Sequence, residues 1–297
     1  MTTYSTIQFT ESMDVTALES FALRLEELGF DTLWLPELFG RDPIGLAGYL
    51  IARTKRMNIG IGIANIYVRD YVCAAQIRQT LAELSGGRFI LGLGVSHPTL
   101  IEPRGHEFLP PTKALGDYLK GIHATTPISP APDEPAPIIC AAHGPKLLEV
   151  VSNHADGAFC LNQPPEHTAW AREIVGPDKK LCVVVRPCFE TNPERARAHA
   201  RNALAFYLPL PAYHRTWKRA GFSDADFENG GSDKLIDTLI AWGDVDKIKA
   251  DIQRHIDAGA SDICLYPINP NEVIGDDQAG GLEPDWNVLE ALGPASQ

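Results

Sequence analysis

Hydrophobic positions along the chain follow two alternating spacings, that of an amphipathic helix and that of a short buried strand. Near the N-terminus, apolar residues recur at the spacing of one helix face: Val15, Leu18, Phe21, Ala22, Leu25 and Leu28. Asp14 precedes them as a predicted N-cap, and Gly29 ends the helix. The apolar run at 31–36 predicts a strand, and Asp42 followed by Pro43 predicts the start of the next helix.

The same alternation continues to the C-terminal region and gives eight units, each a strand followed by a helix. The predicted strands cover residues 6–9, 31–36, 57–64, 88–95, 138–142, 157–161, 181–186 and 262–266. Helices that alternate with short buried strands favour a parallel sheet, and eight units are what a closed barrel requires. The sequence therefore predicts a (β/α)8 TIM barrel, with residues 1–297 forming a single domain.

Long segments interrupt the regular alternation after the fourth and seventh predicted strands. Residues 97–111 form a proline-containing loop, and residues 206–243 insert extra helices after the seventh strand and its helix. In the second insertion, Ser232 is expected to cap a helix that ends near Trp242. Residues 127–137 hold five prolines and predict an extended connector. Long loops in a compact domain are usually functional or disordered, and a barrel carries its function at the C-terminal ends of its strands.

Charge and composition exclude several classes of protein. The 38 acidic and 26 basic residues give a net charge of −12 without a basic stripe, so a nucleic-acid partner is not expected. The N-terminus lacks the features of a signal peptide, and no apolar run approaches the ~20 residues of a membrane span. Cys140, Cys160, Cys182 and Cys264 lie in apolar runs and are expected to be buried and reduced. These patterns predict a cytoplasmic protein without membrane partners.

Residues 71–97, which read YVCAAQIRQTLAELSGGRFILGLGVSH, resemble the luciferase-like monooxygenase superfamily. Residues 25–37, 141–146 with 155–158, and 259–262 resemble the same superfamily and occur in the same order. Residues 221–223, 231–235 and 241–244 are similar to an actinobacterial branch described as oxidoreductases that depend on the deazaflavin coenzyme F-420. The resemblance implies a (β/α)8 barrel, an 8-hydroxy-5-deazaflavin cofactor and a small-molecule substrate. It also allows a homodimer, since members are often dimers.

The resemblance further implies two groups of cofactor-binding residues. A bulge at the end of the third strand would carry a non-proline cis peptide near Gly62 and Ile63 that backs the cofactor ring. The residues so implied are Gly62, Ile63, Ala64 and Asn65 at the bulge, and Ala141, Ala142, His143 and Gly144 after the fifth strand. The alternatives are a strand whose small residues allow close packing, and an ordinary turn between a strand and a helix.

His97 and Glu37 are the candidate catalytic residues. His97 directly follows the fourth strand, where related deazaflavin enzymes place an acid that faces the ring, and an imidazole can donate or accept a proton at neutral pH. Alternatively, His97 only orders the following loop. Glu37 ends the second strand and either orients the cofactor, shuttles a proton or caps the next helix, whereas Phe39 is a candidate wall for an apolar substrate.

Other functions are weighed against this hypothesis. An FMN-dependent monooxygenase on the same barrel is the main alternative, and a non-catalytic deazaflavin-binding protein with a closed substrate pocket is the second. Gly92 and Gly94 do not form a dinucleotide fingerprint, because a third glycine is missing. No metal is expected, because the first strand supplies no ligand. If neither His97 nor Glu37 acts, the aromatic residues of the second insertion are the next candidates: Tyr207, Tyr213 and Trp217.

Overall fold

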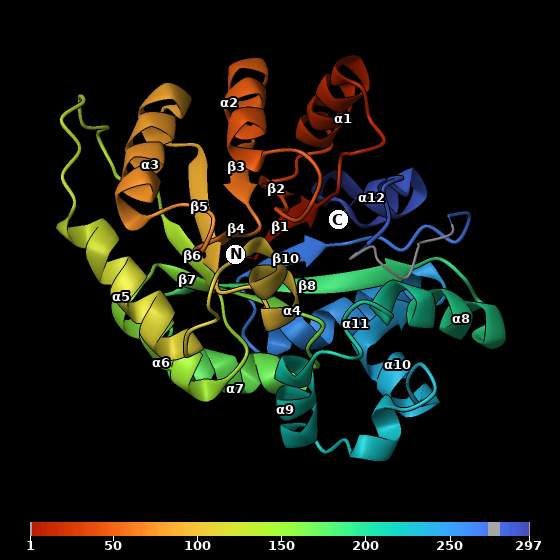
Figure 1. Ribbon diagram of the computed structural model, residues 1–297. Helices are drawn as coiled ribbons and strands as arrows, with labels where there is room; N and C mark the ends of the chain where they lie inside the picture. The colour runs from red at the N-terminus through yellow and green to blue at the C-terminus, as the bar shows by residue number, and fades with distance from the viewer. Residues whose placement is uncertain (1, 273–279, 297) are drawn as a thin grey trace.

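Eight parallel strands form a closed barrel in the computed structural model, which describes residues 2–272 and 280–296. The barrel strands are β1 (Thr3–Ile7), β2 (Thr32–Leu35), β3 (Asn58–Ile61), β5 (Phe89–Gly94), β6 (Ile138–Ala141), β7 (Gly157–Leu161), β8 (Lys180–Cys188) and β10 (Asp262–Leu265). The ring closes because β10 pairs in parallel with both β1 and β8. The predicted (β/α)8 barrel is confirmed (Figure 1).

Helices surround the strands on the outside of the barrel (Figure 1). The surrounding helices are α1 (Val15–Glu27), α2 (Pro43–Arg53), α3 (Tyr71–Ser85), α5 (Pro111–Ala124), α6 (Pro145–His154), α7 (Pro165–Val175), α11 (Val245–Asp257) and α12 (Trp286–Leu292). The predicted N-caps are confirmed, since the Asp14 carboxylate accepts from the Ala17 amide and the Asp42 carboxylate from the Gly45 amide, both at 2.8 Å. Among the described residues, no helix is long and apolar enough to cross a membrane.

The first strand begins earlier than predicted, because its polar side chains are buried. Strand β1 covers Thr3–Ile7 instead of residues 6–9. The hydroxyl of Thr3 donates to the Asp262 carboxylate (2.8 Å), and the hydroxyl of Ser5 donates to the same group. Lys180 forms an ion pair with Asp262 at 3.2 Å. Polar residues that satisfy one another inside a barrel do not produce a hydrophobic pattern, so the start of this strand was missed.

The third predicted strand is divided in two. Strand β3 ends at Ile61, and the short strand β4 (Ala64–Asn65) resumes the same path and pairs with β5. The interruption lies at Gly62 and Ile63, the position at which the family resemblance implies a bulge.

The second insertion begins one helix earlier than predicted. Helix α11 contacts α7, α12 and β8 and so occupies the seventh place in the outer ring. The inserted elements are α8 (Pro193–Leu204), α9 (Pro211–Arg219), η2 (Asp224–Phe227), α10 (Asp233–Leu239) and β9 (Ile240–Trp242). Ser232 caps α10 as expected, but α10 ends at Leu239, and the residues up to Trp242 form a strand that pairs with β8. After β5, the first insertion contains α4 (Pro98–Ile101) and η1 (Glu102–Arg104).

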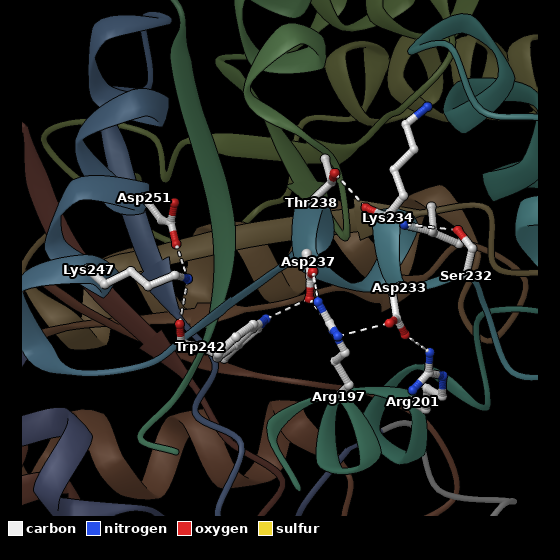
Figure 2. Close-up of polar contacts among 11 residues, drawn as sticks. Arg197, Arg201, Ser232, Asp233, Lys234, Asp237, Thr238, Trp242, Lys247 and Asp251 are labelled. Atoms are coloured by element: carbon white, nitrogen blue, oxygen red, sulfur yellow. Dashed lines mark hydrogen bonds and ion pairs between the residues drawn. The ribbon is translucent and has the colours of Figure 1, made fainter. Parts of the chain in front are cut away.

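A network of charged side chains joins the inserted elements to one another (Figure 2). Arg197 of α8 binds Asp237 of α10 through Nε (2.9 Å) and Nη2 (2.6 Å), and its Nη1 lies 2.8 Å from Asp233. The indole nitrogen of Trp242 in β9 also donates to Asp237 (2.9 Å). The inserted elements α8, α10 and β9 therefore form one connected unit.

The interior of the barrel and the aromatic residues of the insertion form one hydrophobic cluster. Trp34 lies at its centre and contacts Phe159 edge-on, with ring centroids 5.0 Å apart. Tyr213 and Trp217 of α9 belong to the same cluster. A second cluster lies between the strands and the outer helices. The four cysteines predicted to be buried and reduced are buried and free: Cys140, Cys160, Cys182 and Cys264.

Candidate active site at the C-terminal mouth of the barrel

The candidate residues follow strands whose carboxyl ends open on one face of the barrel. Glu37 follows β2, Asn65 ends β4, His97 follows β5 and His143 follows β6. Three contacts connect these residues in two separate groups. The Glu37 carboxylate accepts a hydrogen bond from the Asn65 amide (2.8 Å), and the rings of His97 and His143 both approach Tyr213, at 6.1 Å and 5.2 Å. The structure therefore brings the predicted residues into two neighbouring groups.

The bulge carries the cis peptide implied by the family resemblance, between Gly62 and Ile63. Two glycines of β5 make room for it. A Cβ atom at Gly92 would lie 1.7 Å from the Ile61 carbonyl oxygen, and one at Gly94 would lie 2.4 Å from Cδ1 of Ile63. A Cβ atom at Gly62 itself would face the barrel interior, 3.0 Å from Cβ of Trp34. Gly62 is therefore required by packing inside the barrel, in addition to any contact with a cofactor.

Both oxygens of the Glu37 carboxylate are engaged by neighbouring groups. One accepts from the Asn65 amide, and the other lies 2.7 Å from Nη1 of Arg69. Arg69 also binds Asp42 (2.7 Å), the residue that caps α2. The helix-cap role considered for Glu37 thus belongs to Asp42. Glu37 instead holds the end of β4 and the following loop in place, which is a positioning role.

His97 and His143 are half-buried, and the loss of hydration at the mouth favours the neutral form of both rings. Burial lowers the pKa of His97 to about 4. Burial also lowers the pKa of His143 to about 3, and the nearby His167 and His97 lower it further. A neutral imidazole accepts a proton but is a poor donor, so of the two roles considered for His97 the structure favours acceptance.

Aromatic residues of the insertion cover these histidines, although the sequence suggested them only as a last alternative. The ring of Tyr213 lies 5.5 Å from Tyr207 and 5.3 Å from Trp217. The indole nitrogen of Trp217 donates to the Asn162 carbonyl oxygen (2.8 Å), which fixes α9 to the end of β7. By contrast, Phe39, the predicted wall of the substrate site, has 70% of its surface exposed.

Several buried polar atoms near the mouth have no hydrogen-bond partner among the described residues. They are Nδ1 of His143, both side-chain polar atoms of Asn162 and of Gln163, Nδ1 of His167, and Nε and Nη2 of Arg186. Asn162 and Gln163 follow β7, and Arg186 lies in β8. Buried polar groups are normally satisfied, so a set of unsatisfied ones at a barrel mouth is typical of a ligand site. No sequence pattern indicated Arg186 as a site residue, because it stands at the end of a predicted apolar strand.

Comparison with known proteins assigns the family. The model of the luciferase-like monooxygenase family matches residues 2–262, and the chain belongs to this family. A 5,10-methylenetetrahydromethanopterin reductase of Methanolobus tindarius is 26% identical over 309 residues, covering 90% of this chain and 95% of the relative.

Two solved structures share the fold. An F-420-dependent secondary alcohol dehydrogenase in complex with an F-420–acetone adduct has a TM-score of 0.75 and 17% identity, with coverage of 100% of this chain and 99% of that chain. A riboflavin lyase with modified FMN has a TM-score of 0.67 and 10% identity, with coverage of 90% and 87%. The class is therefore a luciferase-like (β/α)8-barrel oxidoreductase, as the sequence motifs predicted.

Proposed function

We propose that the protein is an F-420-dependent oxidoreductase that transfers a hydride between the deazaflavin and a small organic substrate. The observation that carries the proposal is the bulge at Gly62 and Ile63, which lies beside Ala141 at the end of β6. A Cβ atom at Gly94, between them, would be 2.4 Å from Cδ1 of Ile63 and 3.3 Å from Cβ of Ala141. The F-420-dependent secondary alcohol dehydrogenase named above supports the choice of cofactor.

The residues around the mouth fit a planar, anionic cofactor. No atom lies within 4 Å of the position that a Cβ at Gly144 would take, so the turn before α6 leaves open space. Gly144 is the N-cap of α6, and no side chain caps this helix. Pro145 has no N–H, and the amides of Leu147 and Leu148 donate to the Gly144 carbonyl oxygen, so the amide of Lys146 is the one that this first turn offers to an anionic group. Nδ1 of His143 and the side chains of Asn162 and Gln163 offer donors and acceptors to the polar edge of a ring.

Roles for the candidate residues follow from their surroundings. F-420 supplies a ring carbon that accepts or donates a hydride. Ile63 would back the ring of the bound cofactor, and Ala64, Asn65, Ala141 and Ala142 would frame it, with Glu37 holding the bulge in place. When a substrate alcohol is oxidised, its hydroxyl proton goes to neutral His97, while its carbon gives up the hydride and becomes a carbonyl. Tyr213 and Trp217 exclude water from above.

Equilibrium titration with F-420 and with FMN tests the cofactor. We expect F-420 to bind with a Kd in the micromolar range or tighter, equivalent to about −8 kcal/mol, and FMN to bind at least ten times more weakly. The decrease in fluorescence of either cofactor on binding gives the affinity. If FMN binds ten times more tightly than F-420, the FMN-dependent monooxygenase becomes the correct assignment. If F-420 binds but no alcohol or carbonyl compound is turned over, the non-catalytic binding protein is favoured.

A further inference from the structure

Arg186 is a buried cation that the proposed function leaves without a role. Only 1% of its surface is exposed. Side chains of a strand alternate between its two faces, and Cys182, Val184 and Cys188 of β8 all belong to the cluster inside the barrel. Arg186 lies two residues from both Val184 and Cys188, so its side chain also faces the interior, near the C-terminal end of the strand.

The contacts of Arg186 leave one edge of its guanidinium without a partner. Nη1 donates to the carbonyl oxygen of Ala203 in α8 (2.6 Å). The guanidinium carbon lies 4.6 Å from the ring centre of Tyr266 and 5.8 Å from that of Tyr207. Nε and Nη2 have no hydrogen-bond partner, and no ion pair of Arg186 occurs within residues 2–272 and 280–296. Glu272 and Glu11 act electrostatically on Tyr266, but among the described residues no carboxylate bonds directly to the guanidinium. Aromatic rings offset only part of the cost of burying a charge, so a directly bonded anion would stabilise Arg186.

The unpartnered edge has the shape that a carboxylate fits. Nε–H and Nη2–H point in parallel from one side of the guanidinium plane, and the two oxygens of a carboxylate bind such a pair together. The same chain contains this arrangement on its surface. Arg197 binds the two oxygens of Asp237 through its own Nε and Nη2, at 2.9 and 2.6 Å (Figure 2). Arg186 presents the same pair of donors toward the barrel interior.

The position of Arg186 suggests which molecule supplies the carboxylate. Strand β8 lies opposite β3 in the ring, because three strands separate them in either direction: β5, β6 and β7 on one side, and β2, β1 and β10 on the other. A cofactor ring backed by Ile63 therefore has Arg186 on the far side of the barrel. Tyr207 and Tyr213 connect Arg186 to His97 through ring contacts of 5.8, 5.5 and 6.1 Å.

We propose that Arg186 binds the carboxylate of the substrate through Nε and Nη2, so that the substrates are small carboxylic acids. This inference rests on the proposed function for the location of the cofactor. The carboxylate is held on the β8 side, and the carbon that exchanges the hydride lies between Arg186 and the ring, within reach of His97. Arg186 determines substrate specificity, and the glutamyl tail of F-420 is the other source of the same chemical group.

Pairs of a carboxylic acid and its neutral amide test this assignment on the F-420-loaded protein. Acetate, butanoate and benzoate are each titrated against the corresponding amide by calorimetry. We expect at least one acid to bind ten times more tightly than its amide. Arg186→Gln should reduce this preference to less than twofold. Arg186→Lys, which keeps the charge but loses the paired donors, should retain only part of it. Arg53→Gln, the control at an arginine of α2 whose side chain is 51% exposed, should leave the preference unchanged.

The possible outcomes separate this inference from the proposed function. The assignment of Arg186 to the substrate carboxylate is overturned if no acid binds more tightly than its amide, or if Arg186→Lys keeps the full preference for the acid. It is also overturned if Arg186→Gln weakens F-420 binding tenfold, which would assign the carboxylate to the glutamyl tail. If the wild-type protein does not bind F-420 but prefers acids in an Arg186-dependent way, the carboxylate site stands and the cofactor assignment fails. Because Gln substitution can disturb folding, the melting temperature of each variant is measured in parallel.

Discussion

At the scale of single residues, burial determines the chemistry that each candidate can perform. The location of His97 at the barrel mouth was predictable, because it directly follows a strand. Its charge state was not, because the aromatic cover comes from α9, more than a hundred residues away in the sequence. Arg186 could not be predicted either, since nothing in an apolar strand distinguishes a residue that faces the barrel interior from one that faces the outer helices. Only the hydrogen bonds in the structure show that Asp42 caps α2, whereas Glu37 binds the Asn65 amide.

The neutral state of His97 leads to a testable pH profile. His97→Ala should lower turnover of an alcohol substrate by about 100-fold or more, because it removes the proton acceptor, and should change F-420 affinity by only a few-fold. Since the neutral imidazole is the active form and its pKa is lowered to about 4, kcat/KM of the wild type should fall only as the pH decreases toward 4. His123→Ala, at an exposed histidine, is the control. An acid limb near pH 6.5, or full turnover by His97→Ala, would assign the proton transfer to another group.

At the scale of elements, the strand-and-helix order could be predicted, whereas the local departures from it could not. The helices follow a clear amphipathic spacing and standard caps, so Asp14 and Asp42 mark their starts correctly. The division of β3 and β4 has no hydrophobic signal and was expected only from the family resemblance. The strand β9 was predicted as the end of a helix, because a three-residue apolar run has no distinguishable period.

Two glycines beside the mouth are expected to respond differently to the same substitution. Gly144 has ordinary extended backbone angles and open space around it, so Gly144→Val should fold normally but fill part of the cofactor site. We expect it to weaken F-420 binding at least tenfold with a nearly unchanged melting temperature. Gly62→Val should instead lower the melting temperature by several degrees, because its side chain would press on Trp34. Thermal unfolding and cofactor titration of both variants provide the comparison, and unchanged F-420 affinity in Gly144→Val would exclude this turn from the cofactor site.

At the scale of the whole molecule, ring closure was predictable from the number of units, because eight strand–helix pairs suffice for a barrel. The side chains that meet inside the barrel were not predictable. Asp262, Ser5 and Lys180 form a buried polar group at the N-terminal end of the strands, and each belongs to a segment far from the others in the sequence. Such contacts depend on which strands become neighbours, and the hydrophobic pattern along the sequence does not indicate this.

Several buried histidines make the stability of the whole fold depend on pH. Burial lowers the pKa of His97, His167 and His255 to about 4 and that of His143 to about 3, below the value near 6.5 of an unfolded chain. Between these values the unfolded chain binds protons that the folded protein excludes. The contribution of these histidines to the free energy of unfolding should therefore be complete above pH 6.5. As the pH falls toward 4, the free energy of unfolding should decrease by up to about 1.4 kcal/mol per pH unit for each histidine.

Urea unfolding at several pH values between 7.5 and 5 measures this dependence. Replacing His255 by Gln should reduce the slope, since Gln does not titrate, whereas His123→Ala should leave it unchanged. A free energy of unfolding that stays constant or rises as the pH falls from 7 to 5 would show that these histidines are protonated in the folded protein.

The connected insertion also affects how the barrel mouth can vary. Elements α8, α10 and β9 are joined through Asp237, and β9 pairs with β8, opposite the bulge, whereas α9 extends over the ends of β5, β6 and β7. Substitutions in the inserted elements can therefore change the covering of the mouth without altering the backbone at Gly62 and Ile63.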